Sequence, residues 1–164
     1  MSDNFLPEEY KVPGESAYMK FQLGENKFRI MSKPIIGWED WKDKKPLRFR
    51  MNERPTHAVD PEKAIKHFWA MVVWNYATNK ICVLEITQKG VQNSIAALAK
   101  DADWGNPIEY DLKVTKTGEG LGTEYSTAPV PHKPAPADAV EALKAKPCNL
   151  EALFDGNDPF AQPF

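Results

Sequence analysis

Basic and aromatic side chains gather between residues 28 and 54 of this chain of 164 residues. Trp38 and Trp41 frame an expected loop, GWEDWKDKK, in which Glu39 and Asp40 should be solvated. This segment ends in lysines and is followed by the alternating segment PLRFRM. A single nucleic-acid strand is bound by this combination, because cations follow the phosphates while flat rings stack on unpaired bases. The pattern therefore predicts a surface for single-stranded nucleic acid. The alternative is that both tryptophans fasten a loop to the core and that the lysines form a solvated face.

The side chains assigned to this surface are cations and rings. The cations expected to contact phosphates are Lys20, Arg29, Lys33, Lys42, Lys44, Lys45, Arg48, Arg50 and Arg54. The rings expected to stack on bases are Trp38, Trp41, Phe49 and Tyr76. Trp69 and Trp74 are expected in the core instead, since a central strand uses aromatic residues for packing.

Charge is divided unevenly along the chain. Residues 20 to 54 carry ten basic and five acidic side chains, a net charge of +5, although the whole chain has a net charge of -2. The last seventeen residues, 148 to 164, hold three acids and neither lysine nor arginine. A partner that prefers one sign of charge must therefore be recognised by a local patch.

No set of residues predicts catalysis or a metal site. The three histidines are isolated from one another, and Cys82 and Cys148 are too few and too far apart for a disulfide framework or a zinc site. The glycines of TGEGLG resemble a phosphate loop but lack the lysine and helix that would follow one, so a hairpin turn is expected there. We expect no enzymatic activity, no cofactor and no metal.

No apolar run approaches the roughly 20 residues of a membrane span. The start MSDNFLPEEY has neither a basic region nor an apolar stretch typical of a signal peptide. These features predict a cytoplasmic protein that does not enter a membrane.

The elements that must position the candidate surface are mostly strands. Period-two alternation of apolar and polar side chains is typical of half-buried strands. It occurs in SAYMKFQLGENKFRIM, PLRFRM and PIEYDLKVTKTG, and TEYSTAPV is expected to form the last strand. The segment HFWAMVVWNY is apolar on both faces and predicts a central strand covered on both sides, which forms a central hairpin with KICVLEIT. The segment GVQNSIAALAKDA has helical spacing.

This order predicts an all-β protein with one short helix. A five-stranded, partly closed barrel with a helix between its third and fourth strands, the OB-fold, has the same order, and the central hairpin would extend it. Closure of the barrel would also remove the exposed edges that a small open sheet leaves.

The chain divides into four expected regions. Residues 1–14 form an N-terminal extension, 15–128 the binding domain, 129–147 a linker rich in proline and alanine, and 148–164 an acidic tail. The linker is expected to be extended, although DAVEALKAK allows a short helix that would not be stable by itself. The tail should be a displayed peptide that binds a partner through acids and rings. Those residues are Asp155, Asp158, Phe160 and Phe164.

Two blocks of sequence resemble the single-stranded DNA-binding proteins of tailed bacteriophages. They are FWAMVVWNYATNKICVLEITQKGVQNSIAAL and DADWGNPIEYDLKVTKTGEGLGTEY, followed by the proline-rich linker and the acidic, phenylalanine-ended tail. The resemblance covers roughly residues 15 to 130. The chain departs from it in ending AQPF, which displaces the expected terminal acids, and in lacking the Cys and His clusters with which some phage relatives bind zinc.

The resemblance implies a protein that coats and protects single-stranded DNA in the host cytoplasm during replication, recombination or repair. It also implies recruitment of replication or recombination proteins through the tail, and self-association on DNA is a further expectation. Two alternatives remain at this point. The chain could be an adaptor or inhibitor that acts through its tail, or an RNA-binding protein with the same fold.

Overall fold

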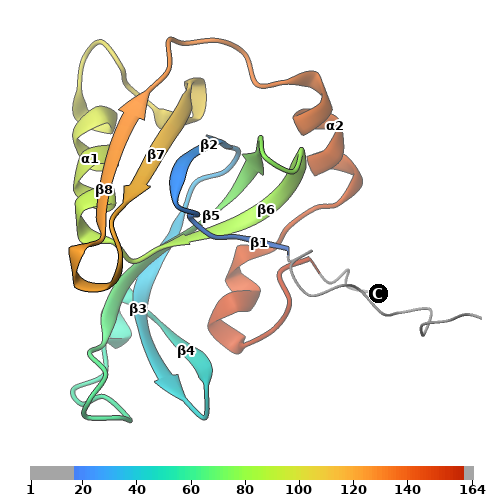
Figure 1. Ribbon diagram of the computed structural model, residues 1–164. Helices are drawn as coiled ribbons and strands as arrows, with labels where there is room; N and C mark the ends of the chain where they lie inside the picture. Colours follow the sequence, from blue (N-terminus) through green and yellow to red (C-terminus); the bar gives the residue numbers. More distant parts are fainter. Residues whose placement is uncertain (1–16, 161–164) are drawn as a thin grey trace, which may run out of the picture.

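The computed structural model describes residues 17–160, which form one large sheet with helices on both of its sides (Figure 1). The strands β1, β6, β5, β2, β7 and β8 lie side by side in that order, and β3 joins β5 and pairs with β4. The strands are β1 (Tyr18–Met19), β2 (Gly24–Ile30), β3 (Ile35–Lys42), β4 (Lys45–Arg50), β5 (Lys66–Asn75), β6 (Lys80–Ile86), β7 (Asp111–Thr117) and β8 (Glu124–Pro129). The α-helices are α1 (Lys89–Lys100) and α2 (Ala137–Ala145), and four short 3₁₀ turns are η1 (Met51–Glu53), η2 (Pro107–Glu109), η3 (Gly120–Gly122) and η4 (Leu150–Asp155).

Strand β5 is the centre of the molecule, as its sequence predicts. One edge pairs with β6, while the other pairs with β3 over its first half and with β2 over its last residues. Met71 and Val73 belong to a core cluster that includes Val91 and Ile95 of α1. Phe68 and Val72 belong to a second cluster on the opposite face. Both faces are therefore covered, which explains why the strand is apolar throughout.

Helix α1 and the β7–β8 hairpin also confirm the sequence pattern. The side chain of Gln92, in the first turns of α1, donates hydrogen bonds to the carbonyl oxygens of Ile86 (2.8 Å) and His67 (3.2 Å), which ties the helix to β5 and β6. Residues 117–122 turn β7 into β8, with positive φ at Gly118 and Gly120. Neither helix of residues 17–160 is long and apolar enough to cross a membrane.

The predicted closure of the barrel is wrong for the described strands. Strand β6 pairs with β5 on one edge and with the short parallel strand β1 on the other, where Tyr18 lies opposite Val83 and Met19 opposite Leu84. In a closed barrel the last strand, β8, would pair with this second edge of β6. Strand β8 pairs only with β7 among residues 17–160, and the sheet stays open.

The segment GWEDWKDKK is not the loop that its acids and lysines predict. It forms β3 and the turn into β4, with Asp43 and Lys44 both in the left-handed region that a two-residue hairpin turn requires. Glu39 and Asp40, which suggested a solvated loop, are buried. Asp40 is 1% exposed and accepts hydrogen bonds from the backbone N–H groups of Trp41 (2.8 Å) and Val59 (2.9 Å).

The predicted extended linker contains a second α-helix, so the expectation of a single helix is wrong. Ala139 of α2 is completely buried, and Leu143 packs against the cluster formed on the outer face of β5 and β6. His132, just before α2, stacks on Trp104 with ring centroids 5.5 Å apart. Packing on the sheet therefore stabilises a helix that is too short to persist alone.

The predicted displayed tail is also wrong over residues 148–160, because this segment covers one face of the sheet (Figure 1). Leu150, Leu153 and Phe160 are 9%, 2% and 7% exposed and pack with Phe68 of β5. Among the tail residues assigned to a partner, Asp155 and Asp158 are exposed, Phe160 is buried, and Phe164 lies outside the described residues. The apolar residues of this segment form part of the core of the domain.

Candidate nucleic-acid interface

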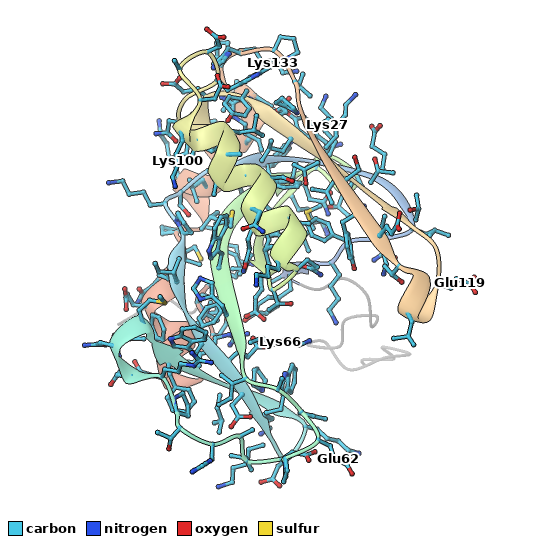
Figure 2. The ribbon with its side chains drawn as sticks, turned by 90° about the vertical axis from the view of Figure 1, so that its left-hand side faces the viewer. Lys27, Glu62, Lys66, Lys100, Glu119 and Lys133 are labelled. Carbon is cyan, nitrogen blue, oxygen red and sulfur yellow. The ribbon has the colours of Figure 1, made fainter. Side chains whose placement is uncertain are left out.

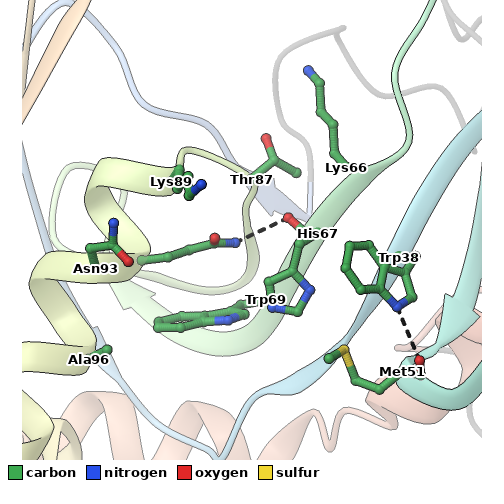
Figure 3. Close-up of a pocket in the computed structure, with 10 residues that line it drawn as sticks. Trp38, Met51, Lys66, His67, Trp69, Thr87, Lys89, Asn93 and Ala96 are labelled. Carbon is green, nitrogen blue, oxygen red and sulfur yellow. Dashed lines mark hydrogen bonds between the residues drawn. The ribbon is translucent and has the colours of Figure 1, made fainter. Parts of the chain in front are cut away.

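A groove opens on the α1 side of the sheet, below the first turn of that helix (Figures 2 and 3). Its volume is about 570 Å³. We call it the aromatic groove, and it is lined by Trp38, Met51, Lys66, His67, Trp69, Thr87, Lys89, Gln92, Asn93 and Ala96.

Strand pairing brings three rings of the groove together. Trp38 of β3 lies opposite His67 of β5 in the register, and their ring centroids are 5.0 Å apart. Trp69 lies two residues further along β5 and therefore faces the same side. All three rings are partly exposed, so a row of aromatic surface is open to a ligand.

Hydrogen bonds hold two of these rings in place. The indole Nε1 of Trp38 donates to the carbonyl oxygen of Met51 at 3.2 Å. The Nδ1 of His67 donates to the carbonyl oxygen of Gly37 at 2.8 Å, which leaves Nε2 as the ring nitrogen for a ligand. Rings that are fixed before binding lose little conformational entropy when a base stacks on them.

Cations flank the row of rings. Lys66 and Lys89 line the groove and are exposed. Figure 3 shows the Lys66 side chain at one end of the groove, extending away from the rings of His67 and Trp38. The guanidinium carbon of Arg54 lies 4.2 Å from the centroid of the Trp38 ring. A guanidinium plane can stack on a base as well as bind a phosphate, so Arg54 extends the platform that Trp38 begins.

Two further hollows adjoin the aromatic groove. The loop hollow, about 740 Å³, is lined by residues of the connection between η1 and β5 and includes Arg54. The apolar cleft, about 180 Å³, shares Trp69 and Ala96 with the groove. None of the described residues lining the three hollows is acidic, while Lys33, Arg54, Lys63, Lys66 and Lys89 all contribute to them. This side of the sheet therefore favours an anionic ligand.

Several predicted residues lie on this side or at its margin. Phe49 is opposite Trp38 in the β3–β4 register and shares its face. Lys33 lines the apolar cleft. The lysines at 42, 44 and 45 are exposed at the tip of the β3–β4 hairpin, and Lys20 is exposed after β1.

Trp41, Arg48 and Arg50 face the opposite side of the hairpin. Trp41 is three residues from Trp38 in the same strand, and this spacing places the two side chains on opposite faces. The two arginines alternate with Phe49 and are therefore also turned away from the aromatic groove. The sequence predicts that these three residues share a surface with Trp38, and the structure places them on the other side of the hairpin instead.

Both arginines already have acidic partners on that opposite face. Arg48 is 10% exposed and lies 2.8 Å from the Glu85 carboxylate. Arg50 lies 3.4 Å from Glu151 and 4.6 Å from the ring centroid of Phe154, so the C-terminal segment contacts its guanidinium while about half of the side chain (51%) stays exposed.

Arg48 also lies 3.7 Å from Glu39, a carboxyl group that is 3% exposed. Burial raises the pKa of Glu39 to about 8, helped by a hydrogen bond with Glu85 and by repulsion from its charge, while Arg48 opposes the shift. A protonated Glu39 can donate to Glu85, which satisfies an oxygen that otherwise lacks a partner. The two acids and one arginine thus form a buried cluster with one proton.

This proton predicts a pH dependence of stability. Between about pH 4.5 and 8 the folded chain keeps a proton on Glu39 that the unfolded chain releases, so the free energy of unfolding falls as pH rises through this window. Glu39→Gln should remove that fall and make the variant more stable, relative to wild type, at pH 8 than at pH 5. Urea unfolding at both pH values measures this difference in the free energy of unfolding, and the variant Glu141→Gln, at an exposed position, is the control. Equal pH dependence in wild type and Glu39→Gln would contradict the assignment.

Arg29 and Tyr76 belong to a second buried cluster, around Asp111. Arg29 is 3% exposed and donates from Nε to the carbonyl oxygen of Ile108 at 2.8 Å, with its guanidinium 3.5 Å from Asp111. The Tyr76 hydroxyl donates to Asp111 at 2.8 Å, and Lys27 lies 4.5 Å from the centroid of its ring. Burial and the hydrogen bond to Asp111 raise the pKa of Tyr76. Both predicted nucleic-acid contacts are therefore engaged in holding β2, β5 and β7 together.

Sequence reasoning missed His67, Trp69, Lys66 and Lys89 as members of the site. Trp69 was assigned to the core, and it does pack against the core cluster at one side while lining the groove at the other. The useful signal was the alternation of His67 and Trp69 on one face of an otherwise apolar strand. Its meaning depends on the register with Trp38, which the sequence does not show.

The described residues hold no cluster of three or more histidine, cysteine, aspartate and glutamate side chains suited to a metal ion. No family model, curated protein or solved structure matches this chain.

Proposed function

We propose that the chain binds single-stranded DNA along the aromatic groove without sequence preference, and acts by binding rather than by catalysis. The observation that carries this proposal is the row Trp38, His67 and Trp69, flanked by cations and free of acids among the described lining residues. Such a protein would coat and protect DNA strands exposed during replication, recombination or repair.

The chemistry of the groove suits a single strand better than a duplex. In a duplex the faces of the bases are stacked on one another, so rings that offer flat apolar faces gain nothing there. A single strand can place its bases on Trp38 and Trp69 while its phosphates approach Lys66 and Lys89. Every base has a π-face, so binding of this kind tolerates any sequence.

The order of the elements supports the same proposal through the fold. Strands β5 and β6, then α1, then β7 and β8 follow a first segment made of β2 and β3, with β4 inserted as a hairpin partner of β3. If β4 and the short β1 are set aside as additions, this order is similar to that of an OB-fold, whose helix follows the third strand. Proteins of this architecture commonly bind oligonucleotides on their strands and loops. We infer an OB-like domain whose barrel is left open where β1 takes the edge of β6.

A titration of the full chain tests the proposal. Fluorescence anisotropy should be measured with labelled oligo-dT, with its duplex and with the matching RNA, each at two salt concentrations. We expect the DNA single strand to bind most tightly and to weaken with salt. No binding to oligo-dT would overturn the proposal, and equal or tighter binding to RNA would replace the ligand, because RNA is distinguished through its 2′-hydroxyl groups.

Lys66→Gln should reduce the salt dependence of oligo-dT binding. Each phosphate contact contributes about 0.7 to the slope of log K against log salt for a single strand, so the slope should fall by about that amount. Lys144→Gln is the matched control, because Lys144 has a side chain 72% exposed on α2, a helix packed on the opposite face of the sheet. An unchanged slope in Lys66→Gln would remove this lysine from the phosphate path.

A further inference from the structure

The apolar cleft is the smallest of the three hollows and differs from the other two in its chemistry. Its volume is about 180 Å³, and it lies between the outer part of α1, residues 32–34 and η2. Ile30, Met71 and Ile95 form its floor and belong to the main core cluster. Ala99 is exposed at its mouth. The cleft is thus an opening into the core with walls that are mostly carbon.

The cleft is continuous with the aromatic groove. Trp69 and Ala96 line both, so the Trp69 ring separates the row of stacking rings from the opening into the core. A DNA single strand that places one base near Trp38 and the next base near Trp69 would bring a neighbouring base to the mouth of the cleft.

The polar groups at its rim are few and they are not acidic. Lys33 is exposed there and can reach a phosphate. The Asn106 side chain accepts a hydrogen bond from the Ile108 N–H through Oδ1 at 3.1 Å, which leaves its Nδ2 to donate to a ligand. Ser32 has little capacity left to bind a ligand, because its Oγ accepts a hydrogen bond from the Val72 N–H (3.0 Å) and donates one to the Lys33 carbonyl oxygen (3.1 Å).

These features select the group that the cleft can hold. A phosphate would lose its hydration against carbon walls, so it belongs outside, near Lys33. A nucleobase can enter with its flat faces against the carbon walls while its polar edge stays at the mouth, where a ring nitrogen or a carbonyl oxygen accepts a hydrogen bond from Asn106. We propose that the apolar cleft receives one unstacked base of the DNA strand bound in the aromatic groove, an inference that rests on the proposed function.

Filling the cleft tests the inference. Ala99→Leu adds a side chain at its mouth, while Ala97→Leu makes the same change on the exposed side of α1, where it lines none of the three hollows. We expect Ala99→Leu to weaken binding of oligo-dT by about 5- to 150-fold, the effect of losing one stacked base, and Ala97→Leu to bind like wild type. Melting temperatures of both variants show whether they are folded. If Ala99→Leu is unstable, Ala99→Met replaces it, since the flexible methionine adapts to its surroundings.

An abasic site moved along the shortest oligo-dT that binds fully provides the second measurement. At one position the loss caused by the missing base should not add to the loss caused by Ala99→Leu, because both remove the same contact. Additive losses at every position, or equal binding by Ala99→Leu and Ala97→Leu, would show that no base enters the cleft, whereas the proposed function would stand. Absence of any binding by wild type would overturn both.

Discussion

Replacing Trp38 with alanine should weaken binding of oligo-dT by about 5- to 150-fold, which corresponds to the loss of one stacked base at about 1 to 3 kcal/mol. The ring is held by its hydrogen bond to Met51, carries the Arg54 guanidinium at 4.2 Å and lies beside His67. Its removal therefore takes away a stacking surface and also releases the cation placed over it.

Trp41→Ala is the matched control for this experiment. Trp41 is in the same strand and is also partly buried, but it faces the other side of the hairpin. Anisotropy titrations of both variants, with circular dichroism to confirm that they are folded, should separate the two faces. Equal losses would mean that the sequence prediction of a joint Trp38–Trp41 platform is right and that the groove is not the binding surface. No loss in either variant would give both rings a structural role.

Much of the strand pattern could be predicted from the sequence because it depends on local alternation. Strands β4 and β7 lie where period-two alternation places them, helix α1 lies where helical spacing places it, and β5 and β6 coincide with the two apolar segments. Strand β3 was missed because Glu39 and Asp40 look like residues of a solvated loop. Their burial depends on Arg48 and on the Val59 N–H, partners that arrive from other segments of the fold.

The aromatic groove shares only some of its residues with the surface that the sequence predicts. Trp38, Phe49 and Arg54 could be chosen because they lie close together in sequence and remain close in space. His67 joins them through pairing of β3 with β5, across a connection whose length hides the register. Arg48 was misassigned for the same reason, since its main partner Glu85 is 37 residues away on β6.

The C-terminal segment was misread because its composition concealed its periodicity. Leu150, Leu153 and Phe154 are spaced by three and then one, as on one side of a helical turn, and this signal was present in the sequence. Acids, the absence of lysine and arginine, and the preceding prolines indicated a solvated peptide instead. This segment covers an apolar face of β5 and β6. That face exists only once the strands have paired, so the sequence alone does not show that it must be covered.

Leu153→Ala should lower the free energy of unfolding by about 2 to 5 kcal/mol, because it removes a side chain that is 2% exposed from a packed cluster. Leu121→Ala is the matched control, as Leu121 is fully exposed in the β7–β8 turn, and it should change stability by no more than about 0.5 kcal/mol. Urea unfolding followed by circular dichroism measures both variants.

The result decides between a structural segment and a displayed peptide. A large loss in Leu153→Ala means that residues 148–160 stabilise the domain, so a deletion of this segment would test folding before it could test recruitment of a partner. A change as small as that of Leu121→Ala would mean that the segment detaches from Phe68 at little cost and is free to bind elsewhere, as its composition predicts. Arg50 would then lose Glu151 and Phe154 and become available to phosphate, which would add a second basic face to the one around Trp38.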